Sequence, residues 1–145
     1  MTAEFPTAVH ALVYLTHKAG TVSSAELADN ICTNPARVRK ILAKLCHAGL
    51  AEAHEGRSSG YHCIADSKKI TLCAVAEALG EIPVSVSWRS GNVDRDCMVS
   101  SGMAAVMDSV YHELNVNCLR TLETITIGSV SEKIFFDKGV IHETV

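Results

Sequence analysis

Apolar residues recur at intervals of three and four through the first third of the chain, and this spacing predicts three successive helices. The first covers residues 5–18, the second begins at Ser23 or Ser24, and the third covers residues 34–48. Ser23 and Glu26 match a capping box, in which each residue satisfies a backbone N–H of the other. Two helices joined by a short turn are typical of a helix-turn-helix.

A short hairpin is predicted directly after the third helix. Two strands, residues 51–55 and 61–65, flank a Gly-Arg-Ser-Ser-Gly turn that permits the backbone angles of a hairpin. Thr71 then caps a fourth helix, which ends at Gly80. A hairpin after a helix-turn-helix is a wing, so residues 1–83 are expected to form a winged helix-turn-helix domain that binds DNA.

The remainder of the chain is predicted to be mainly helical. Residues 84–99 read as a connecting loop, with strand and loop over 84–95 and a turn at Ser-Gly-Asn. Residues 100–136 are expected to hold a dimerisation helix of about twenty residues and a short last helix from 126 to 136. The tail, 137–145, mixes apolar and charged residues and has no predicted structure. The fold class is therefore mainly α with a small β-wing.

The long helix carries one apolar seam that a small wing domain is not expected to cover. The seam consists of Met103, Val106, Met107, Val110, Leu114, Cys118 and Leu122. Pairing with the same helix of a second copy would bury it, which favours a homodimer. In the alternative, the helix folds back on its own domain.

Composition and charge restrict the class of protein. Hydrophobic residues make up 48% of the 145 positions and charged residues 20%, as in a soluble globular protein. The chain has neither a membrane-spanning apolar run nor a signal pattern, so a cytoplasmic protein without membrane contact is expected. The net charge of -3 comes entirely from the residues after position 83, because the first 83 hold eight cations and eight acids.

The third helix concentrates positive charge, with four cations and no acid between residues 34 and 45. On a helix, one face consists of Val38, Ile41, Leu42 and Leu45. The opposite face consists of Ala36, Arg39, Lys40, Ala43 and His47, with Arg37 and Lys44 along its border. Asn34 suits the N-cap and Pro35 the first helical position. One face for the core and one for polyanionic backbone is what a DNA recognition helix requires.

Two other classes of function are less well supported. The chain lacks a phosphate-binding glycine loop, a His-Glu-x-x-His motif and a Cys-x-x-Cys motif, so we expect no enzyme. A winged helix used only for protein contacts is the second alternative. Its exposed helix face would be apolar or of mixed sign, whereas this one is cationic.

Five short segments together resemble a known family. They are residues 8–12 (AVHAL), 44–50 (KLCHAGL), 60–61 (GY), 70–72 (ITL) and 75–79 (VAEAL). In this order the chain resembles the Rrf-type family of bacterial winged-helix regulators, which includes the iron–sulfur cluster regulator and the cysteine-metabolism repressor. The resemblance implies a homodimer that binds imperfect DNA palindromes and represses transcription.

The resemblance also implies where double-stranded DNA is contacted. By alignment the base-reading positions are Ala36, Arg39 and Lys40, and the last two suit guanine O6 and N7. In the wing, the family's arginine is displaced by two residues to Arg57, which is a candidate for the minor groove. The full set of candidate DNA contacts is Asn34, Ala36, Arg37, Arg39, Lys40, Lys44, Arg57, Ser58, Ser59 and Tyr61.

Several members of the family hold an iron–sulfur cluster on three cysteines in the loop before the long helix. Here only Cys97 matches, and the other positions hold Gly91 and Ser85, with Ser100 in place of a downstream histidine found in some members. Because these substitutes are not cluster ligands, we expect no such cluster and no other cofactor. Cys97 is then either a redox-sensing thiol near a helix N-terminus or an interface residue without chemistry.

An unusual cluster or metal site stays open as an alternative, built from His10 with Cys97 or Cys118, across two subunits. The adjacent pairs Cys46-His47 and His62-Cys63 do not point their side chains at one ion, so no metal site is expected there. The cysteines other than Cys97 are expected to be reduced thiols in the core. They are Cys32, Cys46, Cys63, Cys73 and Cys118.

Overall fold

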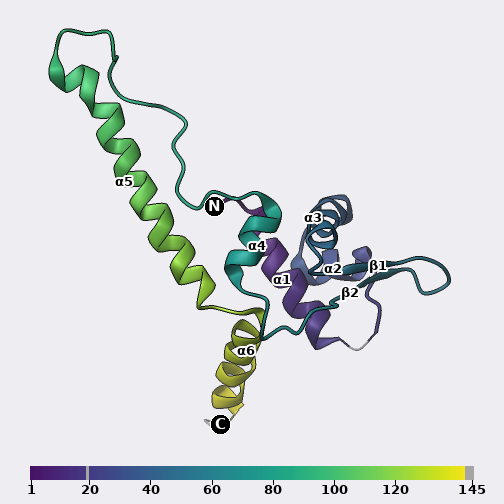
Figure 1. Cartoon of the computed structure of the whole chain (residues 1–145). Helices are drawn as coiled ribbons and strands as arrows, with labels where there is room; N and C mark the ends of the chain where they lie inside the picture. The colour runs from purple at the N-terminus through teal and green to yellow at the C-terminus, as the bar shows by residue number, and fades with distance from the viewer. Residues whose placement is uncertain (19, 143–145) are drawn as a thin grey trace.

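The computed structural model describes residues 1–18 and 20–142, which form six helices and one two-stranded sheet (Figure 1). The elements are α1 (Glu4–His17), α2 (Ser24–Ile31), α3 (Pro35–His47), β1 (Glu52–His54), β2 (Gly60–His62), α4 (Leu72–Leu79), α5 (Met98–Glu123) and α6 (Ile127–His142). The expected fold class, mainly α with a small β-wing, is confirmed.

The core lies among α1, α2, α3 and α4. Its largest fully buried side chains include Leu12 of α1, Leu27 of α2, and Ile41, Leu42 and Leu45 of α3. Full burial of one such side chain stabilises the fold by about 1.5–3 kcal/mol. The apolar face predicted for the third helix is therefore the face that enters the core.

Side-chain caps fix where the helices begin. The Ser23 hydroxyl accepts from the Glu26 N–H (3.1 Å), and the Thr71 hydroxyl accepts from the Ala74 N–H (3.1 Å). The reciprocal half of the predicted capping box does not form. The Glu26 carboxylate instead accepts from the Tyr14 hydroxyl (2.7 Å), because α1 packs beside α2 and presents a stronger donor than a backbone amide.

The wing is anchored to the segment between α1 and α2. Val22 and Tyr61 exchange two backbone hydrogen bonds (2.9 and 2.8 Å), so β2 is paired on both edges. A Cβ at Gly60 would lie 2.5 Å from the Val22 carbonyl oxygen, so only glycine permits this approach. Both strands are shorter than the five residues expected, since the ladder pairs only residues 52–54 with 60–62.

The expectation of a strand within 84–95 is wrong, because these residues, all in the described part of the chain, lie along α5 as an irregular strap. The Asn115 amide bonds both the N–H (2.8 Å) and the carbonyl (2.6 Å) of Val84. One side chain of α5 thus satisfies both backbone groups of Val84, which a neighbouring strand would otherwise pair. The predicted Ser-Gly-Asn turn is present, with Gly91 at φ +81° and the Asn92 N–H bonded to the Ser100 carbonyl (3.0 Å).

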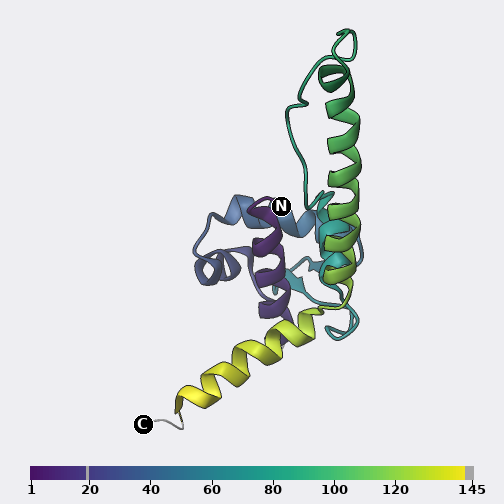
Figure 2. The same cartoon turned by 90° about the vertical axis from the view of Figure 1, so that its left-hand side faces the viewer.

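The helices α5 and α6 leave the domain in different directions (Figure 2). With 26 residues, α5 is longer than predicted because it begins at Met98, directly after the strap. The junction after it is rooted in the domain core, where Leu122 is 8% exposed and Ile127 is fully buried. The last helix continues to His142 instead of ending at 136, and residues 143–145 of the expected tail lie outside the described residues.

Candidate nucleic-acid interface

The outer face of α3 is exposed and cationic. Arg37, Arg39 and Lys40 are exposed, with Ala36 and Ala43 as small residues between them. Among the described residues, these three cations form no ion pair. Figure 1 shows α3 and the wing on the side of the domain away from α5. A duplex would therefore meet this face without contacting the long helix.

Two contacts hold the start of the helix and one of its arginines. The Asn34 side-chain oxygen accepts from the Ala36 N–H (2.7 Å), as a helix cap does, with Pro35 in the first turn. The Arg39 guanidinium donates to the Ser24 hydroxyl (3.3 Å) at the start of α2. Ser24 thus orients a candidate base-reading side chain, a role that the sequence does not signal.

Lys44 differs from the other cations because it already has a partner. Its ammonium lies 2.6 Å from the Glu4 carboxylate of α1, and both side chains are partly buried. The hydrogen bond from Lys44 lowers the pKa of Glu4, and the charges of Lys40 and Arg37 lower it further. The cationic stretch of α3 contains no acid in the sequence. In the structure, however, Glu4 lies beside it, 40 residues before Lys44 in the chain.

The wing presents its candidate residues unequally. Arg57, Ser58 and Ser59 are exposed at the turn between β1 and β2. Tyr61 is half-buried and packs against the core. Its position in β2 next to Val22 gives this tyrosine a structural role.

The candidate sensor Cys97 lies at the other end of the molecule, directly before α5, and is exposed. Backbone N–H groups of Ser100 and Val99 stabilise its thiolate and lower its pKa. This thiol is therefore more acidic than an ordinary cysteine, although Asp94 and Asp96 lie nearby in sequence.

Four of the five cysteines expected in the core do pack there. Burial raises the pKa of Cys46, of Cys63 and of Cys73, the last to about 11, and Cys118 packs against the core edge. The expectation is wrong for Cys32, which is exposed. It is the C-cap residue of α2, in the left-handed conformation (φ 59°), and so lies beyond the last residue of that helix.

The seam on α5 is only partly open to solvent. Val106 is 61% exposed, and Met103, Val110 and Leu114 are 38–47% exposed. Met107 and Cys118 are half-buried. The inclusion of Leu122 in a dimer seam is not supported, because its own domain core already buries this side chain.

A helix-turn-helix followed by a wing defines a winged-helix protein. The profile of the Rrf2 family, described as iron-dependent transcriptional regulators, matches residues 1–133. The chain therefore belongs to the Rrf2 family, and the resemblance stated from the sequence is confirmed. No protein with a curated description matches the chain significantly.

Solved structures share the fold. A candidate transcriptional regulator of Lactobacillus plantarum has a TM-score of 0.80 at 21% identity, covering 99% of this chain and 98% of its own. IscR of T. potens has a TM-score of 0.69 at 18% identity, covering 92% and 87%. CymR, the global cysteine regulator of B. subtilis, has a TM-score of 0.68 at 17% identity, covering 92% and 96%.

Within the described residues of one chain, the side chains do not form a site for the iron or the iron–sulfur cluster that the family implies. Cys97 and Cys118 lie on one helix, about 31 Å apart along its axis at 1.5 Å per residue. The His10 ring bonds the Asn30 side chain (2.8 Å) on α2. Within the described residues, no three His, Cys, Asp or Glu side chains gather where they could hold a metal ion.

Among the residues that the structure describes, none of the helices is both long and apolar enough to cross a membrane.

Proposed function

We propose that this protein is a DNA-binding transcription regulator that acts as a homodimeric repressor. The observation that carries the proposal is the exposed cationic face of α3, on which Arg37, Arg39 and Lys40 have no acidic partner among the described residues. Membership of a family of transcriptional regulators supports it. A dimer would place two such helices in successive major grooves and block access to the DNA between them.

The side chains of α3 divide into two roles. Arg39 and Lys40 reach guanine O6 and N7 and select the sequence, while Ala36 leaves room for a base edge. Arg37 contacts phosphates and binds all sequences equally. Lys44 contributes only when its ion pair with Glu4 opens. Arg57 enters the minor groove beside the site.

The second copy pairs along α5. The exposed part of the seam consists of Val106, Val110 and Leu114, whose apolar side chains are 42–61% exposed on a helix that projects from the domain. An exposed apolar helix face is commonly buried against the same face of a second subunit.

The signal we propose is oxidation of Cys97. An exposed thiol of lowered pKa is the form of cysteine that oxidants attack first. Its place at the tip of α5 would let a modification disturb the paired helices. The Cys97→Ser variant should keep its DNA affinity in oxidant while the parent loses it. A variant that still responds would remove Cys97 from the sensing role.

The test of the whole proposal begins with footprinting of the tagged protein across its genome to recover an operator. Fluorescence anisotropy on that operator is then compared for Arg39→Ala, Lys40→Ala and Arg37→Ala, with Lys133→Ala on α6 as a control of the same charge change. Loss of a base contact should cost about 1–3 kcal/mol and relax base preference at one position. Arg37→Ala should weaken binding to all sequences and lower the salt dependence. Parental affinity in all three variants would contradict this orientation of α3.

A further inference from the structure

Arg39 differs from the other two exposed cations of α3 because another helix holds its side chain. The Nη1 group of its guanidinium donates to the Ser24 hydroxyl of α2 (3.3 Å). Among the residues that the structure describes, Arg37 and Lys40 make neither a side-chain hydrogen bond nor an ion pair. One of three exposed cations is therefore oriented before any DNA is bound.

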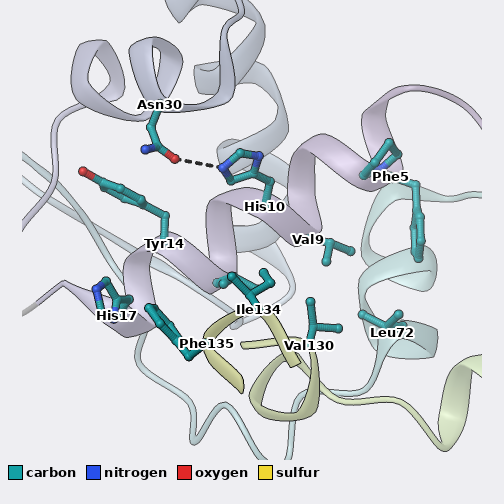
Figure 3. A pocket seen from close by; sticks show the side chains of 12 residues that line it. Phe5, Val9, His10, Tyr14, His17, Asn30, Leu72, Val130, Ile134 and Phe135 are labelled. Carbon is teal, nitrogen blue, oxygen red and sulfur yellow. Dashed lines mark hydrogen bonds between the residues drawn. The ribbon is translucent and has the colours of Figure 1, made fainter. Parts of the chain in front are cut away.

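The helix that holds Arg39 is itself fixed in the domain. Ser24 is the first residue of α2, and Leu27, one turn later, is fully buried in the core. In the last turn of α2, the Asn30 side chain bonds the His10 ring of α1 (2.8 Å; Figure 3). Because α2 also packs against α3, the Ser24 hydroxyl has a defined position beside the recognition helix.

The contact leaves the base-reading edge of Arg39 free. A guanidinium has five N–H donors in a planar fork, and the Ser24 hydroxyl accepts one of those on Nη1. The Nε and Nη2 groups keep a parallel pair of N–H donors, which matches the O6 and N7 acceptors of guanine. A side chain that is already oriented loses less conformational entropy when it makes this pair. Lys40 carries a single ammonium on a flexible stem and so selects a base less strictly.

We propose that Ser24 is a positioning residue that gives Arg39 its preference for guanine, and this step rests on the DNA-binding function proposed above. Ser24 acts through Arg39 and makes no contact of its own with the duplex. Of the two base-reading residues, Arg39 then contributes the larger share of the sequence preference.

The test measures base preference at one position of the operator, namely the position at which Arg39→Ala loses its preference. The affinities of the parent and of Ser24→Ala are compared for the operator and for versions with the other base pairs there, changed in both half-sites. Ser24→Ala should lower the preference for guanine by about threefold to tenfold per half-site, as the loss of one hydrogen bond does. The dependence of affinity on salt should stay parental, because no phosphate contact is lost.

The matched control is Ser109→Ala, which removes an exposed hydroxyl from α5. It should keep the parental preference. Ser24→Thr retains the hydroxyl and should also keep that preference. Ser24→Cys keeps the size of the side chain but offers only a weak acceptor. It should behave like Ser24→Ala and replaces that variant if the alanine protein does not fold.

A double-mutant cycle separates positioning from direct contact with DNA. In the Arg39→Ala background, Ser24→Ala should have no further effect, since the side chain that Ser24 orients is gone. Three results would overturn the proposal. They are a parental preference in Ser24→Ala, an equal loss of affinity for all sequences, and an effect of Ser24→Ala that persists without Arg39.

Failure of this proposal can be told from failure of the proposed function. A protein that binds no operator would contradict both. A protein that binds its operator with a base preference independent of Ser24 would contradict the role of Ser24 alone and leave the regulator in place.

Discussion

The pair of Lys44 and Glu4 shows how a contact from a distant helix changes the meaning of a local pattern. The Glu4 carboxylate lies 2.6 Å from the Lys44 ammonium, and the positive charges of Lys40 and Arg37 also lower its pKa. A surface ion pair of this kind contributes less than about 1 kcal/mol to stability. Its larger effect is on binding, because it lowers the positive charge that α3 offers to phosphate.

Replacing Glu4 with Gln should therefore strengthen DNA binding. Lys44 becomes free to contact a phosphate, and the dependence of log affinity on log salt should steepen by about one unit. Anisotropy titrations at several salt concentrations measure both quantities. Glu132→Gln on α6 makes the same charge change away from α3 and is the control. Unchanged affinity and slope in Glu4→Gln would mean that Lys44 does not face the DNA.

The same pair predicts a pH dependence of stability. Because the pKa of Glu4 is lower in the folded protein than its ordinary value, the carboxylate stabilises the fold above that ordinary value. The contribution is lost as the pH falls through the lowered pKa. Urea unfolding of the parent and of Glu4→Gln should give a difference at neutral pH that shrinks in acid. A difference in unfolding free energy that stays constant with pH would show that ionisation of Glu4 is not its cause.

Two exposed thiols allow the reactivity of Cys97 to be measured against an internal standard. Backbone N–H groups lower the pKa of Cys97, so more of it is thiolate near neutral pH than in an ordinary cysteine. Iodoacetamide should therefore modify Cys97 faster than the exposed Cys32, as followed by mass spectrometry of the two peptides. Equal rates would remove the physical basis for a sensing role of Cys97.

The wing depends on one close approach of the backbone. Gly60 faces the Val22 carbonyl so closely that an added methyl group has no space. Gly60→Ala should cost about 1–3 kcal/mol of unfolding free energy, as overpacking does, and should weaken DNA binding through a displaced Arg57. Ser58→Ala, at the exposed turn of the same hairpin, is the control. Urea unfolding that gives the parental midpoint for Gly60→Ala would contradict this account.

Elements with local signals were predicted well, and those that depend on distant partners were not. Asn34 and Thr71 mark the starts of α3 and α4, because the cap residue satisfies its own helix. The strap before α5 could not be recognised, since the partner of Val84 is Asn115, 31 residues away. The site followed the same rule. The cations of α3 could be read from their spacing, whereas Glu4 and Ser24 come from other helices.

At the scale of the whole molecule, the proposal is that two copies pair through the exposed seam of α5. Val110→Glu should dissociate the proposed dimer, because it places a charge in an apolar contact. Ile64→Glu, at an apolar residue outside the seam that is 51% exposed against 42% for Val110, should leave the mass in sedimentation equilibrium unchanged. A monomer should bind the full operator about 10²–10⁴-fold more weakly, since the second half-site no longer binds as part of one molecule. A Val110→Glu protein that remains a dimer would place the interface elsewhere.

The root of α5 in the winged-helix core has a mechanical consequence. Leu122 and Ile127 clamp one end of a helix about 39 Å long, while its other end stands clear of the domain. A change of about 5° in the angle at the clamp moves the free end by roughly 3 Å over that length. The converse also holds: a small displacement between the free ends of two paired α5 helices would rotate each winged-helix domain. This rotation would alter the distance between the two DNA half-sites that the dimer can span.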